Sequence, residues 1–271
     1  MNLTSPSQVK SWCIEHDFHP NKVLGQNFLI DQNALKAIVD AGLVGCDPRG
    51  TPNVLEVGPG LGVLTEEMLN RGAHVTAIEK DPVLAARLAE SLGNPANLTV
   101  IPGDALDVIA GRAGAPSHAA FDCMVSNLPY QAGTRILLDL VQQHTIPSMT
   151  VLVQTEVAER LAATEGGKTR GLAGVWAQLD YDVKIVRKVA ASCFWPRPEI
   201  GSSVVKLTRH GRNDGLSQEE RKLFYRLTKQ AFEHRRKQLG SIFKGVIEST
   251  LRAEELSNQE WIDLVKGLLA K

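Results

Sequence analysis

Val54-Leu-Glu-Val-Gly-Pro-Gly-Leu-Gly62 is the most informative stretch of the chain, because its pattern predicts a buried strand that is followed by a helix. The run from Val54 to Val57 is short, apolar and rich in β-branched residues, which predicts the strand. Glycine then occupies every second position, and a glycine-rich turn lets backbone N–H groups approach a ligand closely. A helix is predicted over 61–70, with Gly72 as its stop.

The spacing of these glycines argues against a dinucleotide site, whose third glycine stands three positions after the second. Here the pattern is E-x-G-x-G-x-G, with the carboxylate of Glu56 two residues before Gly58. A carboxylate there would repel a pyrophosphate but suits a cation that carries an ammonium and a sulfonium. The pattern resembles the first motif of S-adenosylmethionine (SAM) methyltransferases. A glycine-rich turn without a ligand remains the alternative on this motif alone.

Strands and helices alternate through the first two thirds of the chain. Such a series predicts a parallel sheet with helices on both faces, and ligands bind at the carboxyl ends of its strands. The predicted strands are 53–57, 74–79, 98–101, 121–126 and 149–154, and the helices between them are 61–70, 82–92, 104–111 and 131–143.

Two further acids end predicted strands. Glu79 lies at the end of the second strand, where an acid can accept hydrogen bonds from both hydroxyls of a ribose. Asp104 follows the third strand and could accept a hydrogen bond from an adenine amino group or could cap the next helix. Together with Glu56 they predict one ligand-binding edge.

Ser126-Asn-Leu-Pro-Tyr130 ends the fourth strand and resembles the N/D-P-P-Y/F motif of amino-group methyltransferases. An exocyclic adenine amine is a poor nucleophile, and accepting both of its hydrogens on the Asn127 side chain and the Leu128 carbonyl would direct its lone pair at a methyl donor. Pro129 would fix the backbone, and Tyr130 would offer a ring for base stacking. A plain strand-to-helix turn is the alternative.

The composition describes a globular protein of 271 residues with a formal net charge of zero. Residues 1–200 carry a net charge of −5 and residues 201–271 one of +5, which favours a polyanionic partner for the C-terminal part. The four cysteines suggest neither a disulfide framework nor a metal site, and His16 with His19 lacks an evident third ligand. No apolar run could span a bilayer, so a cytoplasmic protein is expected.

The alternation of strands and helices stops after Arg209, which predicts a first domain over 1–209 and a second over 210–271. Helices are expected over 217–230, 234–249 and 257–270. Residues 221–244 hold eight Lys and Arg but one acid, Glu233. Such a stretch is typical of phosphate contacts or of a solvated helix face.

With these motifs the chain resembles the KsgA/RsmA family of ribosomal RNA adenine N6,N6-dimethyltransferases over nearly its whole length. Besides the two motifs above, four stretches carry the resemblance: Leu24–Leu29 (L-G-Q-N-F-L), Gln154–Arg160 (Q-T-E-V-A-E-R), Phe194–Ser202 (F-W-P-R-P-E-I-G-S) and His234–Leu239 (H-R-R-K-Q-L). The chain departs from the family at Gln131, Arg170 and Ile200, none of which lies in the proposed chemistry.

The resemblance implies a Rossmann-like SAM-dependent methyltransferase domain followed by a small all-helical domain. It places the SAM contacts on Asn27, Leu29, Gly58, Glu79, Asp104 and Asn127. It also makes Phe194 a second wall of the target pocket, although Phe at such a position is more typical of a core. Arg235, Arg236 and Lys237 become candidate RNA contacts.

The implied activity is dimethylation of N6 of two adjacent adenosines in a hairpin near the 3′ end of 16S rRNA, in the small ribosomal subunit or its precursor. The protein would act as a monomer with SAM and no metal, and would take part in small-subunit biogenesis. Two alternatives stay open: a methyltransferase for a large-subunit rRNA adenine, and a ribosome-assembly factor whose binding matters more than its catalysis.

Overall fold

The computed structural model describes residues 1–21, 24–46, 50–111 and 121–270. The chain forms two compact units, each considered by itself. The first unit contains 1–158 and 184–208, and the second contains 159–183 and 209–271.

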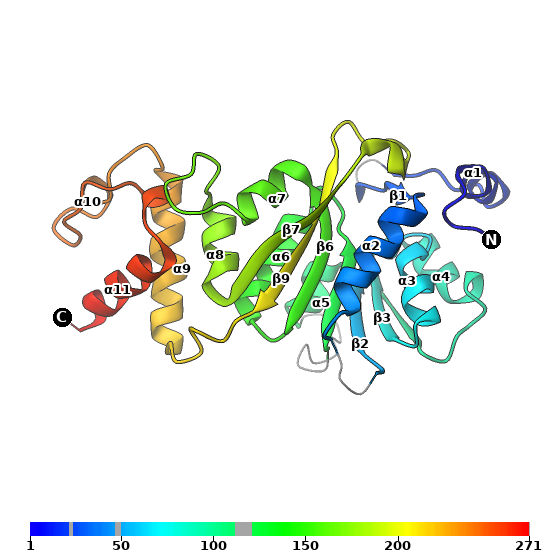
Figure 1. Ribbon diagram of the computed structural model, residues 1–271, viewed down its shortest axis with the longest axis horizontal. Coiled ribbons are helices and arrows are strands. Elements are labelled where there is room, and N and C mark those ends of the chain that lie inside the picture. Colours follow the sequence, from blue (N-terminus) through cyan, green and yellow to red (C-terminus); the bar gives the residue numbers. More distant parts are fainter. Residues whose placement is uncertain (22–23, 47–49, 112–120, 271) are drawn as a thin grey trace. The chain divides into compact units, whose positions relative to one another are not determined.

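A seven-stranded sheet follows the strand order β4-β3-β2-β5-β6-β9-β7 (Figure 1). Strands β2 to β6 pair in parallel, whereas β9 runs antiparallel to β6, so the sheet is mixed. Its strands are β2 (Asn53–Val57), β3 (His74–Glu79), β4 (Leu98–Pro102), β5 (Cys123–Asn127), β6 (Ser148–Gln154), β7 (Tyr181–Val189) and β9 (Ser202–Arg209). A second, two-stranded sheet pairs β1 (Phe28–Leu29) with β8 (Phe194–Trp195).

Helices connect the parallel strands as the sequence predicts. They are α3 (Val63–Asn70), α4 (Pro82–Ser91), α5 (Ala105–Ile109) and α6 (Gly133–Gln143), and a further helix, α2 (Gln32–Leu43), precedes β2. In the view of Figure 1, α2 lies in front of the sheet and α5 and α6 lie behind it. The doubly covered sheet and the carboxyl ends of its parallel strands are the frame that a ligand site of this class needs.

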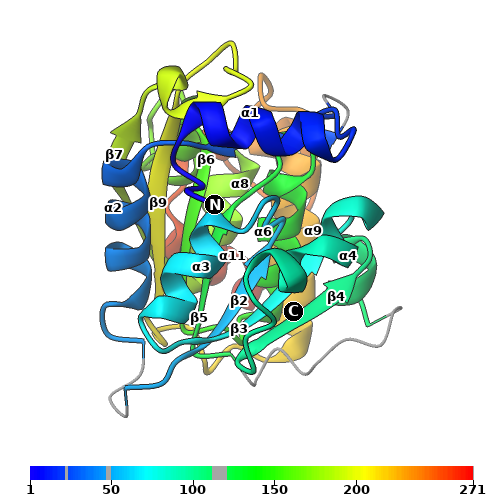
Figure 2. The same cartoon turned by 90° about the vertical axis from the view of Figure 1, so that its right-hand side faces the viewer.

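Local capping fixes where these helices begin. The side chain of Asp31 accepts a hydrogen bond from Ala34 N at 2.7 Å, and that of Asp81 accepts from Val83 N at 3.0 Å. Pro82 then occupies the first turn of α4, where a missing N–H costs nothing. Helix α1 (Pro6–Glu15) also has a proline in its first turn, although the side chain of Ser5 does not cap it, and Figure 2 shows α1 at the top of the view, above α3.

The second unit has its own core. The buried side chains come mainly from α8 (Leu172–Asp180), α9 (Gln218–Glu233) and α11 (Asn258–Leu269), and they include Phe224 and Trp261. Ser217 and Ser257 each begin a helix with a capping box, because each shares reciprocal hydrogen bonds with a glutamate three residues on. The second unit also contains α10 (Leu239–Ile242) and the 3-10 turn η4 (Ala253–Glu255). Two elements of the chain remain: α7 (Thr155–Leu161), which lies at the boundary of the two units in the sequence, and the 3-10 turn η3 (Ala191–Cys193), which belongs to the first unit.

The helix predicted over 234–249 is wrong in its extent, since only Leu239–Ile242 is helical there. Gly245 adopts a φ of +72°, a left-handed conformation that ends a helix. Gly240 donates its N–H to Ser249 O at 2.9 Å, so the chain folds back on itself. A Cβ at position 240 would stand 2.8 Å from that same oxygen, which makes glycine necessary for the close approach.

Candidate active site

A cavity of about 190 Å³ lies in the first unit, at the carboxyl ends of the parallel strands. Residues from β2, β3 and β5, together with the segment that precedes α2, form its wall. Nine of the residues that the sequence nominates line it: Asn27, Leu29, Gly58, Glu79, Asp104, Asn127, Leu128, Pro129 and Tyr130. Asn27 and Asn127, which are 100 positions apart in the chain, therefore converge on one cavity, as segments near parallel strand ends in a sheet of this kind are expected to do.

The glycine turn after β2 forms one side of the cavity. Gly58 and Gly60 both line it, with φ angles of +68° and +60°. A Cβ at Gly60 would stand 3.2 Å from the ring of Phe28, so the turn has no room for a side chain on that side. The bare backbone is thereby presented to the cavity.

Glu79 holds this turn in place. Its carboxylate accepts hydrogen bonds from Gly60 N at 3.0 Å and from Asp81 N at 2.8 Å. Burial raises the pKa of Glu79, and the two backbone N–H groups oppose that rise. A carboxylate fixed by two backbone donors keeps further lone pairs for a ligand in the cavity.

Glu56 is the most deeply buried acid of the site, with 1% of its surface exposed. Its carboxyl accepts a hydrogen bond from the hydroxyl of Thr65 at 2.6 Å. Burial is the main cause that raises the pKa of Glu56 to about 8, and the nearby charge of Glu79 raises it further, while Thr65 lowers it. Thr65 carried no signal in the sequence, because a single hydroxyl on a helix has many ordinary roles.

The raised pKa of Glu56 makes the stability of the ligand-free protein depend on pH. The folded protein keeps a proton that the unfolded chain, with a glutamate pKa of about 4.3, has lost. Stability from Glu56 is therefore full below about pH 4.3 and is lost as pH rises through 8. We expect the fall in Tm between pH 6 and pH 9 to be roughly 5 °C smaller in Glu56→Gln than in the unaltered protein.

Thermal unfolding without ligand measures this difference. Glu79 titrates in the same direction and remains in the variant, so some pH dependence persists. Glu90→Gln, an exposed position on α4, is the matched control and should leave the pH profile unchanged. Identical profiles for Glu56→Gln and the unaltered protein would contradict the assignment.

Asp104 both caps a helix and faces the cavity. Its carboxylate accepts from Leu106 N at 2.9 Å at the start of α5 and forms an ion pair with Lys80 Nζ at 2.7 Å. Asp104 therefore caps α5, as one interpretation of the sequence predicts. Its position in the wall of the cavity is also compatible with the other interpretation, a hydrogen bond to a ligand.

The side-chain amide of Asn127 is oriented by the backbone of Asn27. Asn127 Nδ2 donates to the Asn27 carbonyl at 3.2 Å, and Asn27 Nδ2 donates to Gly25 O at 3.1 Å. Since its nitrogen is engaged, the Asn127 side-chain oxygen is the atom left to accept a hydrogen bond from a ligand.

The residues after Asn127 continue the wall of the cavity. Leu128 is buried and its N–H donates to Leu152 O at 3.1 Å, which joins the motif to β6. The Tyr130 hydroxyl shares a 2.7 Å hydrogen bond with the fully buried Ser202 hydroxyl. Ser202 ends the F-W-P-R-P-E-I-G-S stretch, which was its only signal in the sequence.

The structure does not bring Phe194 to the cavity. Only 2% of its surface is exposed, and it belongs to the core cluster that also contains Leu29, Ile38 and Val204. Its strand β8 pairs with β1, which places Phe194 opposite Leu29 in register. In this conformation Phe194 is a core residue, as its residue type alone favours.

The basic triplet of the second unit follows directly after α9. Arg236 and Lys237 are exposed, whereas the Arg235 guanidinium donates to Lys168 O at 2.6 Å. Among the residues that the structure describes, no group of three or more His, Cys, Asp or Glu could hold a metal ion. None of the described helices is long and apolar enough to cross a membrane.

Known proteins resemble this chain over most of its length. The family model for ribosomal RNA adenine dimethylase matches residues 17–263. A ribosomal RNA small subunit methyltransferase A from Deinococcus radiodurans is 46% identical over 205 residues, which cover 76% of this chain and 67% of that protein. The protein of the same name from Chlamydia felis is 36% identical, and the aligned region covers 99% of this chain and 96% of that protein.

Solved structures show the same fold. A dimethyladenosine transferase from Plasmodium falciparum superposes with a TM-score of 0.74 at 22% identity, covering 89% of this chain and 97% of that one. The 23S rRNA methyltransferase ErmE superposes with a TM-score of 0.66 at 23% identity, covering 89% and 99%. On the strength of the family match over most of its length, this chain belongs to the ribosomal RNA adenine dimethylase family.

Proposed function

We propose that this protein transfers methyl groups from SAM to N6 of two adjacent adenosines in a hairpin near the 3′ end of 16S rRNA. The observation that carries the proposal is the single cavity that joins the glycine turn, Glu79 and the Asn127–Tyr130 motif. The family match supports adenine dimethylation of ribosomal RNA. The names of the relatives, which are small-subunit enzymes, support the choice of 16S rRNA.

The donor set of the cavity suits SAM. The backbone of Gly58 and Gly60 is bare, and the carboxylates of Glu79 and Asp104 stand at neighbouring strand ends. We assign Glu79 to the ribose hydroxyls and Asp104 to the adenine amino group, with Asn27 and Leu29 completing the walls. Glu56 adds a carboxyl whose ionised form a cationic ligand would favour.

SAM supplies a methyl group on a sulfonium, an electrophile that needs only a well-placed nucleophile. The protein's part is to present the adenine amine. Asn127 offers a side-chain oxygen to one N6 hydrogen, since its nitrogen is engaged by Asn27. We assign the second hydrogen to the Leu128 carbonyl and base stacking to Tyr130, with Pro129 fixing the backbone between them. Positioning and electrostatics then supply the rate. As the nitrogen took up the methyl group, the carbon–sulfur bond of the sulfonium would break, and the alkylated nitrogen would shed a proton easily to solvent, so no strong general base is required.

The target base has to leave its stack to reach a cavity of this kind. The second wall that the sequence assigns to Phe194 stays a prediction. Because that ring is packed among core residues, the role requires the segment around β8 to expose it when RNA binds.

The helical second unit would dock the folded RNA through its basic residues, and we propose that the enzyme works as a cytoplasmic monomer. Arg235→Glu combined with Arg236→Glu is expected to weaken RNA binding at least tenfold, since each replaced cation loses a phosphate contact or a support for one. SAM binding should be unchanged. Filter binding with small subunits at fixed salt measures the loss, and equal RNA affinity would remove the claim.

One experiment tests the function directly. The protein is incubated with methyl-labelled SAM and, in separate reactions, with small and with large ribosomal subunits from a strain that lacks the modification, and the label is then located in the RNA. Label on two adjacent adenosines near the 3′ end of 16S rRNA supports the proposal. Label confined to 23S rRNA would make this a large-subunit enzyme.

A role in assembly without catalysis is a separate outcome. Absence of label, together with stable binding to immature small subunits, would favour an assembly factor. A catalytically inactive variant that still rescues growth would show that both roles coexist.

A further inference from the structure

A loop of the second unit, residues 162–171, carries an exposed lysine and is held at several points. We call it the 162–171 loop. It connects α7 to α8 and contains Gly166 and Gly167, so its own backbone would leave it loosely defined. Gly166 N donates to Glu254 O at 2.9 Å, and Arg170 N donates to Gly167 O at 3.0 Å. The loop is therefore anchored to the segment around η4.

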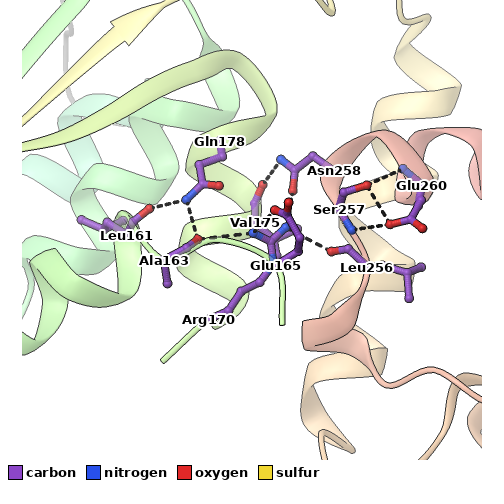
Figure 3. A network of polar contacts seen from close by, with 10 residues as sticks. All are labelled: Leu161, Ala163, Glu165, Arg170, Val175, Gln178, Leu256, Ser257, Asn258 and Glu260. Carbon is purple, nitrogen blue, oxygen red and sulfur yellow. Dashed lines mark hydrogen bonds and ion pairs between the residues drawn. The ribbon is translucent and has the colours of Figure 1, made fainter. Parts of the chain in front are cut away.

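Arg170 is the strongest of these anchors. Its guanidinium is 1% exposed and donates to Leu256 O at 3.2 Å, Asn258 Oδ1 at 3.0 Å and Ala163 O at 3.3 Å (Figure 3). Glu165 lies 4.0 Å away as its ion-pair partner. A cation buried this deeply is retained only where several acceptors compensate for its lost hydration, so Arg170 joins both ends of the loop to the start of α11.

Arg235 anchors the exposed side of the loop. Its Nη2 donates to the backbone carbonyl of Lys168 at 2.6 Å, and its Nε lies 3.7 Å from the Glu254 carboxylate. Its side chain is 40% exposed, and its guanidinium contacts both of these acceptors. The contact brings the backbone of Lys168 beside a triplet that is 67 residues away in sequence.

The result is a group of cations from two segments. Lys168, Arg236 and Lys237 are all exposed. Two of the acids in this region are paired with other cations: Glu254 is 16% exposed and faces Arg235, and Glu165 is the partner of Arg170. Glu233 and His234, which precede the triplet, are also exposed. A surface with more Lys and Arg than acids attracts the phosphates of RNA.

We propose that Lys168 contacts the phosphate backbone of the ribosomal RNA and that Arg235 is a positioning residue that holds the 162–171 loop in register with Arg236 and Lys237. The inference rests on the proposed function, because it takes the RNA substrate from there. Within the basic triplet, Arg235 then supports the loop, whereas Arg236 and Lys237 contact the RNA. Arg170 fixes the loop from its buried side.

Salt dependence of RNA binding tests the contact. Each phosphate contact adds about 0.7–0.9 to the slope of log affinity against log salt, which corresponds to roughly five- to eightfold in affinity at 0.1 M relative to 1 M salt. Lys168→Ala is expected to lower the slope by about 0.7–0.9. At 0.1 M salt it is expected to lower the affinity for under-methylated small subunits roughly five- to eightfold. Lys266→Ala is the matched control, because Lys266 is exposed in the last turn of α11 in the same unit.

A double-mutant cycle tests the role of Arg235. If Arg235 acts by holding the loop, Lys168→Ala costs less than twofold once Arg235→Ala is present, since the lysine is no longer in place. If the two residues contact RNA independently, their losses multiply, and the positioning role is wrong. Arg235→Lys keeps the charge but not the fork geometry, so it should resemble Arg235→Ala.

Failure of this inference is distinguishable from failure of the proposed function. Unchanged RNA affinity and slope in Lys168→Ala, with normal methylation of small subunits by the unaltered protein, overturns the inference alone. Absence of methylation by the unaltered protein overturns the function. Lys168 is exposed and Arg235 is partly exposed, and thermal unfolding verifies that each variant keeps its fold.

Discussion

Asn127→Ala is expected to lower the rate of methyl transfer by roughly 100- to 1,000-fold, the loss seen when one preorganised polar contact to a reacting group is removed. The variant loses the side-chain oxygen that we propose as an acceptor for the adenine amine, together with the amide nitrogen that donates to Asn27 O. The initial rate of label incorporation from SAM into under-methylated small subunits measures the effect.

Two comparisons make this result specific. Asn97→Ala removes the same amide at a turn outside the cavity, where Asn97 Nδ2 donates to Ala73 O at 2.8 Å, and it should keep the rate. Thermal unfolding of Asn127→Ala should remain cooperative. A variant that retains more than a tenth of the rate would refute the role of Asn127.

Glu79→Ala is expected to weaken SAM binding about 100-fold. Two hydrogen bonds from ribose hydroxyls to a carboxylate contribute about 3 kcal/mol together at the lower limit for charged acceptors, and 1.4 kcal/mol corresponds to a factor of ten. The variant also removes the acceptor of Gly60 N, so the glycine turn loses its support. Calorimetric titration of the RNA-free protein with SAM measures the affinity.

Glu90→Ala removes a carboxylate from the exposed side of α4 and should leave SAM affinity unchanged. Glu79→Gln keeps the shape and one acceptor, so an intermediate loss is expected. If Glu79→Ala bound SAM as tightly as the unaltered protein, the ribose would have to lie elsewhere in the cavity.

Much of the site was predictable because its signals are local. Glu79, Asp104 and Asn127 each end a strand in the sequence, and a parallel sheet gathers strand ends at one edge. The glycines after β2 likewise predict a turn without side chains, because they occupy every second position of one short stretch. The helix expected over 234–249 was wrong because the fold-back of Gly240 onto Ser249 outweighs helical propensity.

Other features arise only when distant segments meet. Ser202 binds Tyr130 from 72 positions away, and Arg170 is buried by groups from the C-terminal segment. Neither residue shows a periodic or motif signal of such a contact, so their partners could not be assigned from sequence.

The sequence alone determined the alternation of strands and helices, the glycine turn after the first strand of the series and the N-L-P-Y motif, because strand, turn and residue chemistry are encoded in neighbouring positions. Only the tertiary structure decided that Asn27 engages the amide nitrogen of Asn127, why the pKa of Glu56 rises to about 8, and which side chains surround Phe194 in the core. These properties depend on burial and on hydrogen-bond partners from remote segments, and both exist only after the chain has folded.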